Sequence, residues 1–322
     1  MRDARIQLRS PSGLLIEAST GSSDGVLDQF YQDYDAAFVL ENEKEGRAGF
    51  VECLALNGEA YPELAARFGA FRELVLVARD SAGGRRIGGA NFVAFPLQAP
   101  PGSDTQLLSL NLNYVFINPP ARRQGYLKRL VNDLPRVALS LFAATNAADV
   151  PPSWTATGGV GSAPQVLVFI EQNDPYRMSP EDYELDTRYT GLDQIARIGI
   201  WSRLGARIVD FPYVQPPLSR EQVADQSLVL AVLGAGADAL SACLLHDHLR
   251  RFFGVSVLKG ADPSGEPSAA QQLTSLAALC AGRGAIPLLA PHGLERALRQ
   301  CPPGTTPRPA SLLHLPGVQA GP

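Results

Sequence analysis

A basic cluster around one glycine is the stretch of this chain whose residue types most clearly suggest chemistry. Two arginines precede the glycine in Arg122-Arg123-Gln124-Gly125-Tyr126-Leu127, and three further basic residues follow at Lys128, Arg129 and Arg136. The chain as a whole has a formal net charge of −4, so this local positive charge is not a general property of the sequence. A positively charged segment with a glycine that allows close backbone approach is typical of an anion-binding site.

Two elements, with different spacings of their apolar residues, must position this cluster. Residues 107–117 alternate as a β-strand does, with one face made by Leu108, Leu110, Leu112, Tyr114 and Phe116. The other face carries Ser109, Asn111 and Asn113. After the glycine the apolar residues have helical spacing, at Leu127, Leu130, Val131 and Leu134. The first N–H groups of such a helix have no intrahelical partner, and together with the helix dipole they favour an anion.

The order strand, basic glycine loop and helix resembles a known family. Arg122-x-x-Gly125-x-Leu127, after a strand that ends Val-Phe-Ile-Asn-Pro, resembles the pyrophosphate-binding motif of the GNAT superfamily of N-acetyltransferases. That motif reads Arg/Gln-x-x-Gly-x-Gly/Ala, so Leu127 departs from it at the sixth position. The resemblance implies that acetyl-CoA, or another acyl-CoA, binds as cosubstrate. It assigns the binding to Val115, Phe116, Ile117, Arg122, Arg123, Gln124, Gly125, Tyr126 and Leu127.

A second segment also resembles the family. Ile200-Trp201-Ser202-Arg203-Leu204-Gly205-Ala206 is similar to its Leu-Tyr-x-Lys-Leu-Gly-Phe segment, in which the tyrosine often protonates the departing CoA thiolate. Trp201 stands at that position, and an indole N–H does not deliver a proton in this way. We therefore expect Trp201 to be a cofactor-binding residue that packs beside the pantetheine arm.

Three polar residues are candidates for the catalytic step. Glu171 ends the apolar strand Val166–Ile170 and could act as the general base that takes a proton from an amine, or could be a structural carboxylate. Asn111 and Asn113 cannot act as bases at neutral pH, but they can orient substrate or water. The resemblance implies that the amine attacks the thioester carbonyl directly, with positioning and backbone donors supplying most of the rate.

The remaining pattern of elements is consistent with this family. The sequence predicts an α/β (α+β) fold with a GNAT-like central mixed, mostly antiparallel sheet flanked by helices, and with a C-terminal extension. We expect a GNAT-like acyl-CoA-binding domain over residues 1–235 and an α/β extension over 236–301. Residues 302–322 contain six prolines and almost no charge, and we expect a poorly ordered tail.

Composition excludes several other classes. The chain has 322 residues, of which 45% are hydrophobic and 19% charged, and its slight negative charge argues against nucleic-acid binding. No apolar run approaches the length that spans a membrane, so we expect no membrane partner.

Four scattered cysteines argue against disulfides and zinc sites and favour a cytoplasmic location without a bound metal. His246 and His248 are two residues apart, which favours surface histidines over a metal pair. The resemblance to the acetyltransferase family implies a small-molecule or peptide amine as the partner; the oligomeric state stays open, with a homodimer as one option.

A competing motif lies further along the chain. After the apolar run Leu228–Leu233 comes Gly234-x-Gly236-x-x-Ala239, which has the form of a dinucleotide fingerprint if a helix follows directly and a second strand begins at Val255. This pattern leaves open an NAD- or FAD-dependent oxidoreductase. A CoA-binding module without turnover is another alternative, because Leu127 and Trp201 both depart from the family pattern.

Overall fold

The computed structural model describes residues 4–38, 44–97, 107–144, 164–219, 221–289, 291–303 and 309–315. The chain forms two compact units. Unit 1 contains Met1–Val166 and Gly254–Ala261, and unit 2 contains Leu167–Phe253 and Asp262–Pro322. The domain boundary suggested by the sequence at residue 235 lies within unit 2 and stays a prediction.

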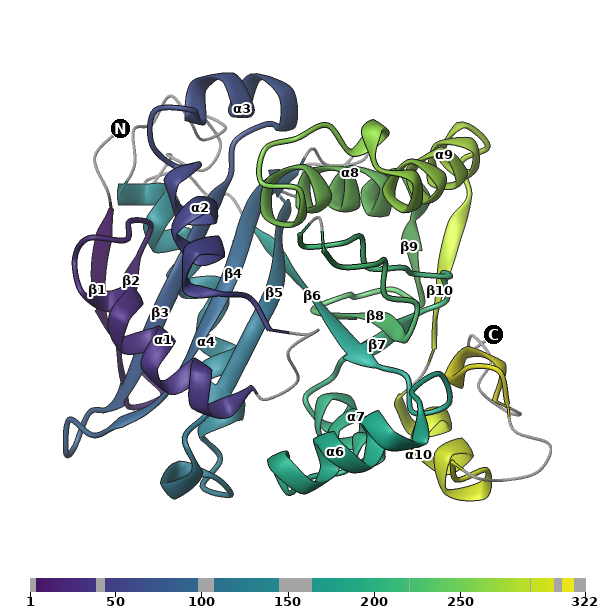
Figure 1. Ribbon diagram of the computed structural model, residues 1–322, viewed down its shortest axis with the longest axis horizontal. Helices are drawn as coiled ribbons and strands as arrows, with labels where there is room; N and C mark the ends of the chain where they lie inside the picture. Colours follow the sequence, from purple (N-terminus) through teal and green to yellow (C-terminus); the bar gives the residue numbers. More distant parts are fainter. Residues whose placement is uncertain are drawn as a thin grey trace. The chain divides into compact units, whose positions relative to one another are not determined.

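Unit 1 is built on antiparallel strands that follow one another in chain order. They are β1 (Arg5–Arg9), β2 (Leu14–Ser19), β3 (Arg72–Asp80), β4 (Arg86–Leu97) and β5 (Leu107–Ile117). Each of the described pairs β1–β2, β2–β3, β3–β4 and β4–β5 is antiparallel. Gly13 makes the turn between β1 and β2 with φ 83°. This unit therefore ends its run of strands on the one that leads into the basic loop (Figure 1).

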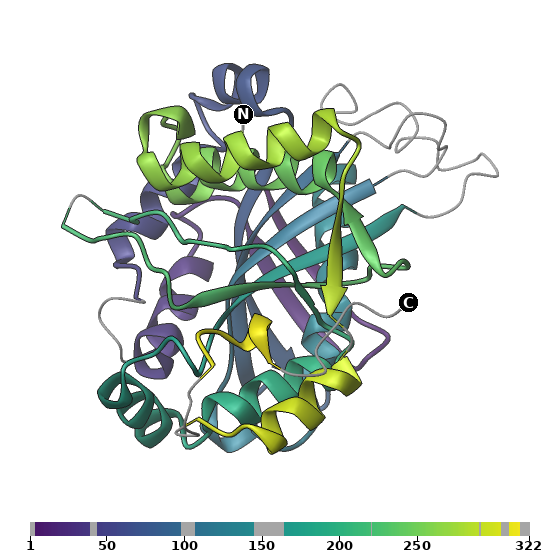
Figure 2. The same cartoon turned by 90° about the vertical axis from the view of Figure 1, so that its right-hand side faces the viewer.

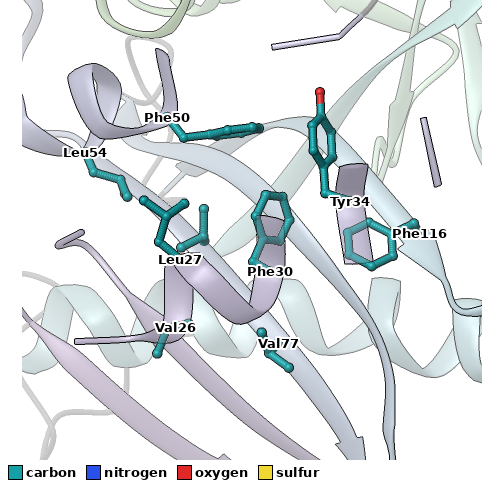
Figure 3. Packing of buried hydrophobic residues seen from close by; sticks show 9 residues of the cluster. Val26, Leu27, Phe30, Tyr34, Phe50, Leu54, Val77 and Phe116 are labelled. Atoms are coloured by element: carbon teal, nitrogen blue, oxygen red, sulfur yellow. The ribbon is translucent and has the colours of Figure 1, made fainter. Parts of the chain in front are cut away.

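Helices cover both faces of this sheet. They are α1 (Val26–Ala37), α2 (Arg47–Ala55), α3 (Tyr61–Phe68) and α4 (Tyr126–Ala144). In Figure 1, α1 and α2 lie in front of the strands and α4 lies behind them. Figure 3 shows the apolar contact on the α1 face, where Phe30, Phe50 and Phe116 pack together. The helix α4 continues through Pro135, although a proline removes one backbone hydrogen bond.

Unit 2 has shorter strands whose order in space differs from their order in the chain. The strands are β6 (Gln165–Asn173), β7 (Arg207–Val209), β8 (Leu228–Leu233), β9 (Ala239–Ser241) and β10 (Ala285–Leu289). They lie in the order β6-β8-β7-β10-β9, and every described pair within this unit is antiparallel. The connection from β6 to β7 contains α6 (Pro180–Thr190) and α7 (Gln194–Arg203).

The remaining helices of unit 2 follow its later strands. They are α8 (Ala242–Phe252), α9 (Pro267–Ala281) and α10 (Pro291–Gln300), and Figure 2 shows α8 and α9 side by side. The expected fold class, α/β with a mostly antiparallel sheet flanked by helices, is confirmed by these elements. Among the described residues, none of the helices has the length and hydropathy needed to cross a lipid bilayer.

Two expectations about the C-terminal part are wrong. A disulfide joins Cys243 on α8 to Cys280 on α9. The sequence could not indicate this bond, because the packing of two helices brings together cysteines that are 37 residues apart. The bond removes the premise on which a cytoplasmic location was expected, and that location stays a prediction.

The expectation of a poorly ordered tail is also wrong for residues 309–315. The Ser311 hydroxyl and the Leu312 backbone N–H both donate to the carboxylate of Asp174, at 2.6 Å and 2.9 Å. Ser311, Leu312 and Asp174 are all fully buried. The rest of the expected tail, apart from residues 302 and 303, lies outside the described residues.

Candidate functional site

The basic loop lies between the end of β5 and the start of α4. Asn118-Pro119-Pro120 ends the strand, and a short 3-10 turn over Pro119–Ala121 leads into the loop. Arg122, Arg123, Gln124 and Gly125 are all exposed, and α4 begins at the next residue. The predicted order of strand, glycine and helix is therefore confirmed. The loop presents its basic residues at the helix N-terminus, where the helix dipole is positive.

The backbone of the loop has an unusual conformation. Arg123 has φ 61° and Gly125 has φ 76°, both in the left-handed region. A side chain makes this region unfavourable by about 1–2 kcal/mol, so Arg123 is strained, and such strain is frequent in ligand-binding loops. A Cβ added at Gly125 would meet no described atom within 4 Å, so the space beside this backbone is open to a ligand.

Several side chains hold the loop in this shape. The Arg122 Nε donates to the backbone oxygen of Ile117 at 3.1 Å, and the Gln124 amide donates to that of Pro120 at 2.9 Å. The buried Tyr126 donates to Asp80 at 3.2 Å, which connects the start of α4 to the β3–β4 hairpin. Leu127 is half-buried. Gln124 therefore braces the loop, while the exposed Arg123 extends from a fixed backbone.

A β-bulge in β5 changes the predicted faces of this strand. The register with β4 passes from Phe92 opposite Leu112 to Asn91 opposite Tyr114, so Asn113 has no opposite residue on β4. Directly opposite residues of an antiparallel pair share a face, and an extra residue shifts every later side chain to the other face. The prediction that the face of Leu108, Leu110 and Leu112 also carries Tyr114 and Phe116 is therefore wrong.

The bulge places the two predicted asparagines in one hydrogen-bond network, in which Asn111 is buried and Asn113 half-buried. The Asn111 side-chain amide donates to the Asn113 side-chain oxygen at 2.9 Å, and Asn113 donates to Asn91 on β4 at 2.9 Å. Asn91 in turn donates to the carboxylate of Glu73 on β3 at 2.7 Å. We call Asn111, Asn113, Asn91 and Glu73 the amide ladder. The sequence analysis found the two members on β5 and missed Asn91 and Glu73, although a glutamate directly before the apolar run Leu74–Ala78 was a visible signal.

The end of β5 is less open than the resemblance implied. Phe116 is buried against Phe30, with ring centroids 5.6 Å apart, so a cofactor would meet its backbone and not its ring. Val115 and Ile117 are half-buried and lie opposite Ala90 and Gly88 of β4. Their roles as cofactor-binding residues stay proposals.

The other two predicted site residues belong to unit 2. Glu171 on β6 accepts a hydrogen bond from the phenol of Tyr213, a residue that the sequence analysis missed. Burial, together with the nearby charge of Glu171, raises the pKa of Tyr213 well above its usual value, so this phenol remains a donor. Trp201 on α7 is 8% exposed. The glycine loop and the amide ladder belong to unit 1, and the catalytic and binding roles of all these residues stay proposals.

The dinucleotide fingerprint lacks its required context. The strand β9 intervenes between Gly236 and α8, so no helix begins at the glycine loop. The second strand expected at Val255 is also wrong, because residues Phe253–Val257 form a π-helical turn. A dinucleotide site of this type needs a parallel βαβ unit, whereas β8 pairs antiparallel with both β6 and β7. The structure therefore does not favour the oxidoreductase alternative.

The expectation of surface histidines is wrong for one of the pair. His248 is fully buried and stacks on Phe169, with ring centroids 3.9 Å apart. Burial lowers the pKa of His248 to about 3, and the charge of Arg251 adds to this effect. Within the described ranges, no group of three or more His, Cys, Asp and Glu side chains is placed to hold a metal ion.

Comparisons with known proteins give matches in structure only. No family model and no curated protein matches the sequence. In structure, the chain is similar to a protein of Bacteroides thetaiotaomicron described as a GNAT-family acetyltransferase, with a TM-score of 0.41 and 15% identity over 81% of this chain and 100% of that one.

Two other solved structures illustrate the range of the similarity. Arabidopsis thaliana Naa50, in complex with the bisubstrate analogue CoA-Ac-MVNAL, has a TM-score of 0.33 and 10% identity over 68% of this chain and 97% of that one. The ribosomal-protein-S5-alanine acetyltransferase of Vibrio fischeri has a TM-score of 0.32 and 10% identity over 72% and 98%. With scores this low, the proposals below depend on this chain's own residues.

Proposed function

We propose that this protein is an acyl-CoA-dependent N-acyltransferase that transfers an acetyl group from acetyl-CoA to a primary amine. The observation that carries this proposal is the loop Arg122–Gly125, with its two left-handed residues, its basic side chains and its open space at the start of α4. Backbone N–H groups and positive charge at a helix N-terminus suit a diphosphate, which carries two negative charges in an acyl-CoA.

The proposed reaction is a direct acyl transfer. The amine nitrogen attacks the thioester carbonyl, the carbon–sulfur bond breaks, and the CoA thiolate leaves. Glu171 is the proposed acceptor of the amine proton, and Tyr213 holds its carboxylate in one orientation. Asn111 and Asn113 orient the acceptor or a water molecule. The acceptor is a small-molecule or peptide amine, and the thiolate takes its proton from solvent, because a thiol pKa of about 8.5 allows this near neutral pH.

Two measurements test this function. Calorimetry with acetyl-CoA and with NAD should show binding of the first and no binding of the second. Consumption of the thioester should then depend on a primary amine, tested with a panel of polyamines, amino sugars and short peptides with free N-termini. Binding of NAD in place of acetyl-CoA would reject the proposal. Binding of acetyl-CoA without turnover for any amine would favour a CoA-binding module.

A further inference from the structure

The innermost member of the amide ladder is a carboxylate buried where no solvent reaches it. Glu73 is 1% exposed at the start of β3. Its side chain accepts from Asn91 at 2.7 Å and from the Ser256 hydroxyl at 2.5 Å, and its own backbone groups bond with Asn57. A carboxyl group is costly to bury, and the bonds from Asn91 and Ser256 offset part of that cost.

The ladder has a defined direction that starts at Glu73. Asn91 donates one N–H to Glu73 and the other to the backbone oxygen of Leu74, at 2.7 Å and 2.8 Å. Both amide hydrogens are then used toward β3, so the Asn91 oxygen must face β5, where it accepts from Asn113. The Asn113 oxygen accepts from Asn111 in the same sense. The amide orientations of the three asparagines are therefore linked, and two acceptors on β3 anchor them, the Glu73 carboxyl oxygen and the Leu74 backbone oxygen.

This direction is independent of the protonation state of Glu73. Burial raises the pKa of Glu73 to about 7, and the bonds from Ser256 and Asn91 oppose this shift. When the carboxyl group is protonated, it can donate to the Ser256 hydroxyl, which rotates to accept, while the other oxygen still accepts from Asn91. The other ionisable groups of this neighbourhood are Cys53 on α2, which bonds to the Ser256 backbone, Lys259, and Glu45 and Glu52, which pair with Lys259.

We propose that Glu73 is a positioning residue for the amine acceptor: through Asn91 it fixes which amide atoms Asn113 presents at the bulge of β5, while the fully buried Asn111 donates to the Asn113 oxygen. The inference rests on the proposed function, because it assumes that the acceptor meets Asn113. Asn113 is the half-buried residue of the ladder and lies at the bulge, where the strand departs from regular pairing. Glu73 acts there without touching the substrate and without giving up or taking the amine proton.

The test compares two substitutions of Glu73 that differ only in whether an acceptor oxygen remains. Glu73→Gln keeps an oxygen for Asn91 and places its NH₂ group toward Ser256, which is how the protonated carboxyl group bonds. We expect it to retain kcat to within about threefold. Glu73→Leu removes the side-chain acceptor and leaves the Asn91 amide held on β3 by the Leu74 backbone oxygen alone. It should lower kcat about tenfold, the effect of one lost hydrogen bond, without raising the KM for acetyl-CoA.

Two further variants test whether a loss of kcat in Glu73→Leu comes only from a damaged fold. Asn91→Ala interrupts the ladder one step further on and should lower kcat as Glu73→Leu does, even if the leucine variant does not fold. Ser256→Ala removes the other bond to Glu73, leaves the ladder intact and should keep kcat near that of the wild type. A Glu73→Gln variant as impaired as Glu73→Leu would overturn the proposal. Activity would then require the charge or the proton of Glu73, and an acceptor oxygen alone would not be sufficient. An unchanged kcat in folded Asn91→Ala would also overturn it.

A second readout separates this inference from the proposed function. The side-chain amide NMR signals of Asn113 and Asn111 should be preserved in Glu73→Gln and displaced in Glu73→Leu, with or without turnover. If the wild type transfers no acyl group, the displaced signals still establish the ladder, and the catalytic part of the inference falls with the function. If the signals of Asn113 do not respond to Glu73→Leu, the positioning role is rejected even for an active enzyme.

Discussion

The two units each contain a strand that runs into a glycine loop, and the two loops have different structures. In unit 1, β5 leads through Arg123 and Gly125, both left-handed, directly into the 19-residue helix α4. In unit 2, β8 leads through Gly234 and Gly236 into another strand, β9, and α8 begins only at Ala242. Of the two loops, only the one in unit 1 places a helix N-terminus directly after its glycine, which an anion site of this kind requires.

The units also differ in how each holds a buried ionisable group. In unit 1, Glu73 is bonded to side chains that determine its geometry, and burial raises its pKa to about 7. In unit 2, His248 stacks on Phe169 and lies near Phe252, and burial lowers its pKa to about 3. Both groups favour the neutral form, but one is an acid and the other a base. The stability of the protein should therefore respond to pH with opposite signs at the two positions.

The first and largest predicted effect concerns this difference in sign. Glu73 keeps its proton in the folded chain up to about pH 7, whereas the unfolded chain loses it from about pH 4.5, so its contribution is lost as pH rises through this window. The effect is about 3 kcal/mol at most. His248 stays neutral when folded while the unfolded chain binds a proton below pH 6.5, so its contribution is lost as pH falls toward 3. Here the limit is about 5 kcal/mol.

Chemical denaturation of the wild type, Glu73→Gln and His248→Phe between pH 3 and pH 8 would measure both contributions. Relative to the wild type, Glu73→Gln should lose the fall in unfolding free energy above about pH 4.5. His248→Phe should lose the fall below about pH 6.5, whatever its absolute stability. Parallel pH profiles for the wild type and either variant would show that the corresponding group titrates normally in the folded protein.

The second prediction compares the two glycine loops directly. Gly125→Val should weaken acetyl-CoA binding at least tenfold, about 1.4 kcal/mol, because a side chain would enter the open space beside a left-handed backbone. Gly236→Val is the matched control, because a Cβ there also meets no described atom within 4 Å. Calorimetry should find its acetyl-CoA affinity close to that of the wild type. Loss of acetyl-CoA binding in a folded Gly236→Val variant would show that the cofactor site has been assigned to the wrong glycine loop.

Sequence periodicity was sufficient for the elements of unit 1. The alternation of residues 107–117 and the helical spacing after Gly125 predicted β5 and α4 correctly, because local period reflects which side chains are buried. The same reasoning failed for residues 253–257, where a short apolar run forms a π-helical turn and not a strand. Short apolar runs are ambiguous between strand and helix, and only tertiary packing decides between them.

The candidate site was predictable only where its residues are close in sequence. The loop at Arg122–Gly125 could be recognised from spacing, since one segment supplies the whole arrangement. Glu73 and Asn91 reach Asn113 only through the register of three strands, which depends on a bulge that no local pattern revealed. For the same reason the pairing of Cys243 with Cys280 and the bond of Tyr213 to Glu171 could not be predicted.

The third prediction concerns the charges of the loop in unit 1. Arg122 and Arg123 are proposed to contact phosphate groups, so acetyl-CoA binding should weaken as salt is added, and Arg122→Ala or Arg123→Ala should flatten that dependence. Arg136→Ala is the control, because it removes an equal and exposed charge. Arg136 lies about 15 Å along α4 from the start of the helix, which is beyond the screening length at physiological salt. Equal salt slopes for the wild type and both loop variants would contradict the assignment.

The smallest expected effect concerns Trp201 in unit 2. It tests whether Trp201 protonates the CoA thiolate. We propose that Trp201, 8% exposed on α7, acts as an apolar wall for the pantetheine arm. An indole N–H is a donor that does not ionise near neutral pH, so it cannot serve as the acid for the thiolate. Trp201→Phe should therefore retain kcat to within about threefold, with any loss appearing in the KM for acetyl-CoA or in stability.

Steady-state kinetics with saturating amine would separate these parameters, and Ile198→Val on the same buried side of α7 provides a control for packing alone. A fall in kcat of roughly a thousandfold in folded Trp201→Phe, at an unchanged KM, would contradict the assignment. The loss would then belong to the transition state only, and the indole N–H would have to stabilise the charge that develops on the thioester.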